Sequence, residues 1–382
     1  MPLRVGFRLV RAHEWMGGAN YILNVSRVLR TWAPEIVPVM FASPDIDKGL
    51  AKRIEAATGA PALPLRDRGH GDDLRAMLGR DELESTEQFR AAGIDVLFES
   101  TGYYGKRPAL PTLAWLHDFQ HRGLPGFFTH RQWLTREIRN QLVLRNRTDV
   151  LLSSLAASDD LKRFYGTPKA EIHVVPFAVQ LERQSNYAHG EAARKRLDLP
   201  ERFIFFPGQF WAHKNHKLVI EALGQIAGEK PVVVAAGPTR DLRAPNLLSE
   251  MVDRIDQLGL WRNFRIMGSL PYADILALAS RADAILNPSQ FEGWSTTVEE
   301  AKALGTPLVL SNLQVHREQA GNIATFFDPH DPVDCGRALA AVPPRLRMPD
   351  SAASLVARNE AAQRQFAQSF GAALTRAWER WN

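Results

Sequence analysis

Short apolar runs alternate with helical segments along almost the whole chain, and this alternation constrains the fold more than any other feature. The first set of expected strands lies at 3–9, 36–41, 95–98, 112–116, 149–153 and 172–175. The second set lies at 203–206, 232–235, 264–267, 284–286, 308–310 and 324–327. Strands that alternate with helices are typical of parallel sheets covered on both faces. The sequence therefore predicts an α/β protein with two Rossmann-like, doubly wound domains.

A polar connector at about residues 180–200 separates the two sets of strands. We expect one domain over 1–180 and a second over 181–362, with a C-terminal helix at about 363–382 that crosses back to the first. A chain of 382 residues is long enough for two cores. Because doubly wound sheets bind ligands at the carboxyl ends of their strands, we expect the two domains to face a ligand-binding cleft.

The composition narrows the class of protein. The chain is 45% apolar and 23% charged, as in ordinary globular proteins. A net charge of +5 suits an anionic membrane surface, a phosphorylated acceptor or nucleic acid. The absence of zinc-ligand spacing and of RNP-like aromatic segments argues against nucleic acid. A single cysteine, no apolar run of about twenty residues and no signal-peptide pattern indicate a cytoplasmic protein.

Residues 284–307 (AILNPSQFEGWSTTVEEAKALGTP) predict a buried strand, a polar loop and a helix. Thr296 or Thr297 is expected to cap the helix, and Gly305 to end it in a left-handed conformation. The free N–H groups of the first helical turn form an anion site.

Two carboxylates flank this helix start: Glu292 in the loop, and Glu300 about one turn inside the helix. A carboxylate there can accept hydrogen bonds from ribose hydroxyls while the N–H groups hold a diphosphate. The alternative is structural, because Thr296 with Glu299, and Thr297 with Glu300, each form the pattern of a capping box. If Thr296 is the cap, Glu299 closes the box and Glu300 is left to bind a ligand.

The stretch FEGWSTTVEEAKALGTPLVLSN resembles the E-x7-E signature of retaining glycosyltransferases with the GT-B fold, family 4 in particular. The resemblance covers most of the chain and is strongest over 203–328. It implies that Glu300 binds the ribose of a nucleotide sugar and that Glu292 lies beside the sugar as a catalytic residue. It also implies donor contacts at Gly293, Trp294, Ser295, Thr296 and Thr297. The family has Gly-Phe-Gly where this chain has Gly-Trp-Ser, which limits how closely the backbone can approach a ligand.

Two features of the first half fit the same resemblance. Gly17 and Gly18 precede an expected helix at 21–30, and glycines there let a phosphate approach backbone N–H groups, although such pairs also form ordinary turns. They resemble the glycine-rich first loop of GT-B transferases, which implies a donor contact. His117 ends an expected strand beside Asp118, in the run HDFQHRGLPGFF, which resembles a family 4 segment where a histidine contacts the transferring sugar. A strand-end histidine can also be structural.

The segment FIFFPGQFWAHKNHK predicts a strand, a glycine turn and a helix. It resembles the Gly-Arg-…-Lys segment of the same family, whose arginine and lysine clamp the β-phosphate of the donor. Lys214 matches the lysine and is expected to be catalytic, whereas Gln209 stands at the arginine position. One fixed cation is therefore missing, for which Arg8, Arg11 or His213 could compensate.

Two further segments complete the expected site. By resemblance, backbone groups around Met267 and Leu270 contact the nucleobase. Asp45 and Asp47 have the Asp-x-Asp form that metal-dependent transferases use, but they read as a solvated turn. We therefore expect no metal and no other cofactor.

Residues 127–147 (FFTHRQWLTREIRNQLVLRNR) predict a basic amphipathic helix. Such a helix can lie on an anionic membrane at the inner face, or bury its apolar stripe with its arginines in water.

The sequence thus predicts a retaining, metal-independent glycosyltransferase that uses a nucleoside diphosphate sugar and a glycan or lipid-linked acceptor, in cell-surface polysaccharide synthesis. Two alternatives stay open: a GT-B epimerase or phosphorylase, and a non-catalytic nucleotide-sugar-binding subunit, which Gln209 would suit.

Overall fold

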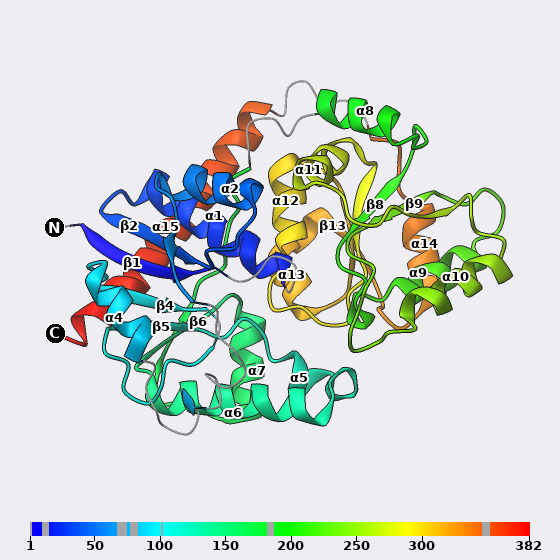
Figure 1. Cartoon of the computed structure of the whole chain (residues 1–382). Coiled ribbons are helices and arrows are strands. Elements are labelled where there is room, and N and C mark those ends of the chain that lie inside the picture. The colour runs from blue at the N-terminus through cyan, green and yellow to red at the C-terminus, as the bar shows by residue number, and fades with distance from the viewer. Residues whose placement is uncertain are drawn as a thin grey trace. The chain divides into compact units, whose positions relative to one another are not determined.

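The computed structural model describes residues 2–9, 15–66, 75–76, 83–100, 102–181, 187–345 and 352–382. The chain divides into two compact units (Figure 1). The N-terminal unit comprises Met1–Arg122, His130–Gln180 and Asn359–Asn382, and the C-terminal unit comprises Gly123–Thr129 and Leu181–Arg358.

The described strands of the N-terminal unit form a seven-stranded parallel sheet in the order β3-β2-β1-β4-β5-β6-β7. They are β1 Leu3–Arg8, β2 Ile36–Ala42, β3 Leu63–Pro64, β4 Val96–Glu99, β5 Thr112–Trp115, β6 Asp149–Leu152 and β7 Glu171–Val174. Strands β4, β5 and β6 are buried along their whole length, which explains their continuous apolar sequence. The sequence did not predict β3, because its two exposed residues, Leu63 and Pro64, lie at the sheet edge and are too few to form a recognisable strand pattern.

Helices cover this sheet (Figure 1). They are α1 Met16–Trp32, α2 Lys48–Thr58, α4 Leu83–Ala91, α5 Gln120–Gly123, α6 His130–Asn146, α7 Leu155–Tyr165 and the C-terminal part of α15 Ala352–Glu379. Phe370 of α15 packs its ring 5.2 Å from Phe98 and 6.4 Å from Phe7, over the middle of the sheet. Asp47 caps α2 by accepting a hydrogen bond from the Leu50 N–H at 2.9 Å. One part of the Asp-x-Asp pair thus has a structural role.

The C-terminal unit contains a six-stranded parallel sheet in the order β10-β9-β8-β11-β12-β13. Its described strands are β8 Ile204–Pro207, β9 Val233–Ala236, β10 Phe264–Ile266, β11 Ala284–Asn287, β12 Leu308–Ser311 and β13 Ala324–Phe327. Its described α-helices are α8 Tyr187–Arg196, α9 His216–Gln225, α10 Leu247–Gln257, α11 Tyr272–Arg281, α12 Thr296–Leu304, α13 Gln314–Ala320 and α14 Pro332–Ala340. The strand order reverses between β8 and β11, which makes this the point where such sheets bind ligands.

The predicted α/β class with two doubly wound domains is confirmed, and each of the twelve predicted strands is present to within one residue at either end. One prediction about a helix is wrong. The first helix begins at Met16 and not at Tyr21, so Gly17 and Gly18 lie in its first turn. The predicted connector at 180–200 contains α8, which packs on α11 through Gly190, where a Cβ would lie 2.3 Å from the Ala277 carbonyl oxygen. In the part of the chain that the structure describes, no helix is long and apolar enough to cross a bilayer.

Candidate functional site

The loops that follow β8, β9 and β11 are joined through their backbones. Phe210 N donates to Pro238 O at 2.9 Å, and Gln290 N donates to His213 O at 2.8 Å. At Gly237 a Cβ would lie 2.0 Å from the Gly208 carbonyl oxygen, so only glycine permits this approach. The loops that carry Gln209, Lys214 and Glu292 therefore form one rigid surface at the carboxyl ends of the strands.

Glu292 is held through one of its two carboxylate oxygens. Its Oε1 accepts from Lys214 Nζ at 2.5 Å, from Ser289 Oγ at 2.7 Å and from Asn287 Nδ2 at 3.5 Å. Its Oε2 has no hydrogen-bond partner among the described residues, and the side chain is 11% exposed. The carboxylate is thus fixed on the protein side and has one oxygen left for a ligand.

The Glu292 carboxyl group is ionised at neutral pH. Burial alone would raise its pKa, but Lys214, His213 and His316 outweigh burial and lower the pKa to about 2. His316 donates from Nδ1 to the Ser311 carbonyl oxygen at 2.9 Å, so its Nε2 carries the lone pair in the neutral ring. The site therefore combines a fixed negative charge with a neighbouring fixed ammonium.

The cap of α12 differs from the prediction. Ser295, and not Thr296 or Thr297, is the N-cap, and its Oγ accepts from Val298 N at 3.4 Å. Since Val298 stands where a capping box needs a glutamate or glutamine, neither predicted box forms. The N–H groups of Thr296 and Thr297, at the first two helical positions, have no partner in the described part of the chain. They stay available to an anion.

The adjacent glutamates of α12 have different partners. Glu299 Oε1 accepts from Lys302 Nζ at 2.8 Å and from Gln319 Nε2 at 2.9 Å, and Trp294 also bonds this carboxyl group. Glu300 Oε1 accepts from the Tyr272 hydroxyl of α11 at 2.7 Å. Glu299 therefore ties α12 to α13, whereas Glu300 points toward α11. Gly305 ends the helix with φ of 63°, as predicted.

The other predicted donor-binding residues lie on neighbouring strand ends. Met267 and Leu270 are half-buried after β10, where Met267 N donates to Ala235 O at 2.9 Å. Gln209 is half-buried in the loop after β8. Of the cations considered as replacements, His213 is buried near Glu292, Arg8 of the N-terminal unit donates to Arg66 O at 2.7 Å, and Arg11 lies outside the described residues.

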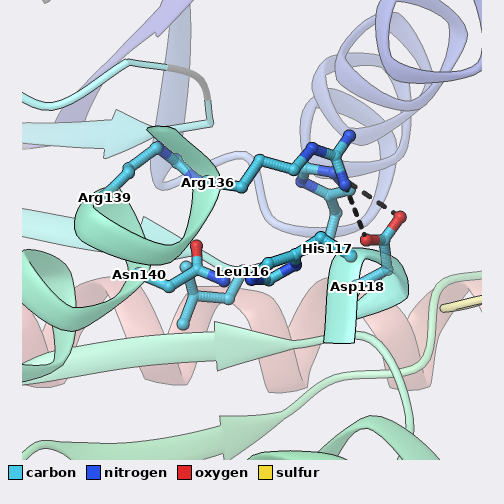
Figure 2. A pocket seen from close by; sticks show the side chains of 7 residues that line it. Leu116, His117, Asp118, Arg136, Arg139 and Asn140 are labelled. Carbon is cyan, nitrogen blue, oxygen red and sulfur yellow. Dashed lines mark hydrogen bonds and ion pairs between the residues drawn. The ribbon is translucent and has the colours of Figure 1, made fainter. Parts of the chain in front are cut away.

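In the N-terminal unit, His117 and Asp118 follow β5 (Figure 2). His117 Nε2 lies 3.6 Å from Asp118 Oδ2, and Arg136 Nη1 lies 3.2 Å from Asp118 Oδ1. His117 Nδ1 is buried without a hydrogen-bond partner among the described residues. Burial lowers the pKa of His117 to about 4, with Asp118 opposing that shift, so the ring is neutral at pH 7.

The glycine pair supports His117 through packing. The Trp15 ring lies 4.6 Å from the His117 ring, and a Cβ on Gly18 would lie 2.3 Å from the Trp15 ring. Gly18 is therefore needed to seat Trp15 against His117, whereas a Cβ on Gly17 would meet Trp15 only at 3.4 Å. Among the described residues no side chain caps this helix start, so its first N–H groups also suit an anion.

A small pocket opens beside His117, with a volume of about 20 Å³. Its lining residues are Leu116, His117, Asp118, His121, Arg136, Arg139 and Asn140 (Figure 2). This volume holds about one water-sized group, so the pocket fits a single hydroxyl and not a sugar ring. The described residues contain no cluster of three or more histidine, cysteine, aspartate or glutamate side chains arranged to hold a metal ion.

Comparison with known proteins connects this geometry to a family. Residues 191–342 match the family described as "Glycosyl transferases group 1". D-inositol 3-phosphate glycosyltransferase from Corynebacterium urealyticum is 25% identical over 245 residues, 60% of this chain and 57% of that protein. Mannosylfructose-phosphate synthase from Agrobacterium fabrum is 24% identical over 211 residues, 52% of this chain and 46% of that protein. The chain spans about half the length of these curated relatives.

Solved structures extend the likeness to the whole chain. Anabaena Alr3699/HepE in complex with UDP-glucose superposes with a TM-score of 0.68 at 14% identity, over 99% of either chain. At this identity the likeness concerns the fold, and with the two parallel sheets it confirms the predicted GT-B fold class.

Proposed function

We propose that the protein is a retaining, metal-independent glycosyltransferase that moves a sugar from a nucleoside diphosphate sugar to a hydroxyl of a glycan or lipid-linked acceptor, in cell-surface polysaccharide synthesis. The observation that carries the proposal is the Lys214–Glu292 pair beside the uncapped N–H groups of Thr296 and Thr297. The match to group 1 glycosyltransferases and the fold shared with a protein that holds UDP-glucose support it.

The chemistry follows from the charge that develops during transfer. When the bond between sugar and diphosphate breaks, negative charge gathers on the departing phosphate. The Thr296 and Thr297 N–H groups and the Lys214 ammonium would stabilise that charge without a metal ion. Oε2 of Glu292 would face the sugar, and Glu300 would accept hydrogen bonds from the ribose. His117 would contact the transferring sugar.

A thermal-shift screen over UDP-, GDP-, ADP- and dTDP-sugars, with and without EDTA, tests the donor class. We expect one nucleotide series to raise the melting temperature equally in both conditions. Glu300→Ala should then remove most of the shift, while Glu250→Ala, a change at an exposed carboxylate of α10, should leave it intact. Unchanged donor affinity in Glu300→Ala would contradict the assigned site.

Gln209 supports the alternative of a non-catalytic nucleotide-sugar-binding subunit, because a fixed cation is missing there. That alternative predicts donor binding without turnover for every acceptor, and Gln209→Arg should then raise affinity without creating activity. An epimerase would interconvert the donor sugar, and a phosphorylase would release sugar 1-phosphate only in the presence of phosphate.

We also propose that α6 contacts an anionic membrane surface. Leu134 and Ile138, one turn apart, are 43% and 38% exposed, and Arg131 and Arg145 are exposed on the same helix. The buried residues of α6 include two polar side chains, Glu137 and Asn140, so the expected apolar stripe is not the buried face. Apolar residues flanked by arginines suit an interface with anionic lipid.

Sedimentation with vesicles tests this contact. The double variant Leu134→Glu/Ile138→Glu should lose binding to phosphatidylglycerol vesicles. Leu155→Glu, at another exposed leucine of the same unit, is the matched control. Equal sedimentation of all three proteins would contradict the proposal.

A further inference from the structure

Arg243, in the loop after β9, has an unusual setting. Its Cζ lies 5.2 Å from the centre of the Trp211 ring and 5.3 Å from that of the Phe128 ring, and both aromatic residues belong to the same C-terminal unit. Its side chain is only 16% exposed. A guanidinium group stacked on aromatic rings keeps the N–H groups along its edge available to an in-plane partner.

A buried carboxylate fixes the inner end of this side chain. Asp241 Oδ1 accepts from Arg243 Nε at 3.3 Å and from Arg243 N at 2.9 Å. Asp241 Oδ2 accepts from Ala212 N at 3.2 Å, at the start of the short turn that ends with Lys214. The same carboxylate therefore positions both Arg243 and the turn that carries Lys214.

None of the described residues pairs with the outer end of Arg243. Its Nη1 and Nη2 have no hydrogen-bond partner in the described ranges. Other arginines of the same unit use this end: Arg281 donates from Nη2 to Glu201 O at 2.9 Å, and Arg254 donates from Nη2 to Glu221 Oε2 at 2.7 Å. A guanidinium fork that is held in place but unpaired is pre-organised for a phosphate, which it binds through two parallel hydrogen bonds.

The loop that carries Arg243 adjoins the loop that lacks a cation. Gly208 N donates to Ala236 O at 2.9 Å, and Phe210 N donates to Pro238 O at 2.9 Å, on either side of Gln209. Arg243 therefore brings a positive charge to the border of the surface where the sequence places Gln209.

We propose that Arg243 anchors a phosphate-binding subsite of the C-terminal unit, which supplies the positive charge that Gln209 does not. This inference rests on the proposed function in one respect, since the phosphate belongs to a substrate of that site. The phosphate comes either from the diphosphate of the donor or from a phosphorylated acceptor.

The test uses the full chain and three variants. Arg243→Gln removes the charge and the fork, and Arg243→Lys keeps the charge without the planar fork. Arg240→Gln is the matched control, because Arg240 is exposed on the same loop. Calorimetry with inorganic pyrophosphate, UDP and uridine gives the affinities, and the melting temperature of each variant reports folding separately.

If the donor supplies the phosphate, Arg243→Gln should weaken pyrophosphate and UDP binding at least tenfold and leave uridine binding unchanged. Arg243→Lys should recover part of the loss. If the acceptor supplies it, UDP binding should be unchanged, and Arg243→Gln should weaken binding of glucose 6-phosphate, but not of glucose, at saturating UDP.

The proposal is overturned if Arg243→Gln lowers only the melting temperature, or if the wild-type chain binds neither pyrophosphate nor glucose 6-phosphate at millimolar concentration. Failure of the proposed function looks different. In that case no nucleotide binds, while pyrophosphate still binds in a manner that depends on Arg243.

Discussion

Glu292 of the C-terminal unit and His117 of the N-terminal unit are restrained to very different degrees. In the C-terminal unit, Glu292 Oε1 accepts three hydrogen bonds and the carboxyl group is ionised. In the N-terminal unit, His117 is neutral, its one polar contact is 3.6 Å long, and its Nδ1 has no partner within the described residues. One site is built around fixed charge, and the other around an unsatisfied neutral ring.

This difference indicates different tasks. A fixed charge lowers the energy of a charged transition state because little reorganisation is needed when the reaction occurs. A buried nitrogen without a partner costs free energy until a ligand supplies the missing hydrogen bond. We therefore expect changes near Glu292 to affect mainly turnover, and changes at His117 to affect how the ligand is held.

The largest expected effect is that of Lys214→Met. Removing the ammonium should lower kcat by a factor of about 10² or more, because the leaving diphosphate loses its cation. It should also raise the pKa of Glu292, since Lys214 is the strongest of the groups that lower it. Steady-state kinetics with Lys217→Met, an exposed lysine of α9, as control would measure this. Equal losses in both variants would show that the effect is not specific to the site.

A smaller effect is expected at His117. His117→Phe keeps a ring to pack against Trp15 but removes both nitrogens, so the substrate should be held about tenfold more weakly and its KM should rise, for the loss of one hydrogen bond of roughly 1–1.5 kcal/mol. Because burial holds the pKa of His117 at about 4, the ring is neutral from pH 5 to 8. Between pH 5 and 8, the pH profile of kcat/KM should therefore have the same shape in His117→Phe as in the wild type. An acidic limb near pH 6.5 that disappears in His117→Phe would refute the neutral ring.

The features that the sequence could predict are those that depend on one short segment of the chain. Strand positions follow from continuous apolar runs, which burial on both faces demands, so all twelve predictions hold to within one residue at either end. The left-handed stop at Gly305 follows from local chemistry, because a residue without Cβ suits that conformation. Such features depend on one short segment and can be read from it.

Features that depend on distant segments could not be read in this way. Tyr272 bonds Glu300 across 28 positions, and nothing in the segment around Glu300 indicates a hydroxyl from α11. Ser295 becomes the cap although two threonines follow it, in part because Asn287 donates to its Oγ at 2.9 Å from the end of β11. The segment around Gly18 resembles a phosphate-binding loop in sequence. In the structure, however, it is the Trp15 ring that leaves no room for a Cβ at this position.

His216 is a second neutral, buried histidine, and a comparison with it shows whether neutrality alone indicates a binding role such as that proposed for His117. Its ring lies 4.2 Å from the rings of both Phe206 and Phe210, and both ring nitrogens lack a partner in the part of the chain described. Burial, with smaller effects of Lys214 and His213, lowers its pKa from 6.5 to about 3. A depressed pKa makes the folded state bind fewer protons than the unfolded state. Its stabilising effect is thus fully present above about pH 6.5 and is lost as the pH falls toward 3.

Urea unfolding at several pH values would measure this effect. Below about pH 6, the wild type should lose about 1.4 kcal/mol of unfolding free energy per pH unit more than His216→Phe. The two proteins should bind nucleotides equally at pH 7.5, because the ring is sealed between phenylalanines. Parallel stability curves would show that His216 is already paired or already protonated.

The smallest expected effect concerns the restraint on Glu300. Tyr272→Phe removes the hydroxyl that bonds Oε1, so the carboxylate should lose part of its orientation toward the ribose. A bond of about 1 kcal/mol corresponds to a severalfold rise in the donor Kd, with little change in kcat. Calorimetry would distinguish this from the opposite result. Tighter donor binding by Tyr272→Phe would mean that the tyrosine and the ribose compete for the same oxygen of Glu300. Glu300 would then resemble His117, because each would have a hydrogen-bonding position that a ligand is meant to fill.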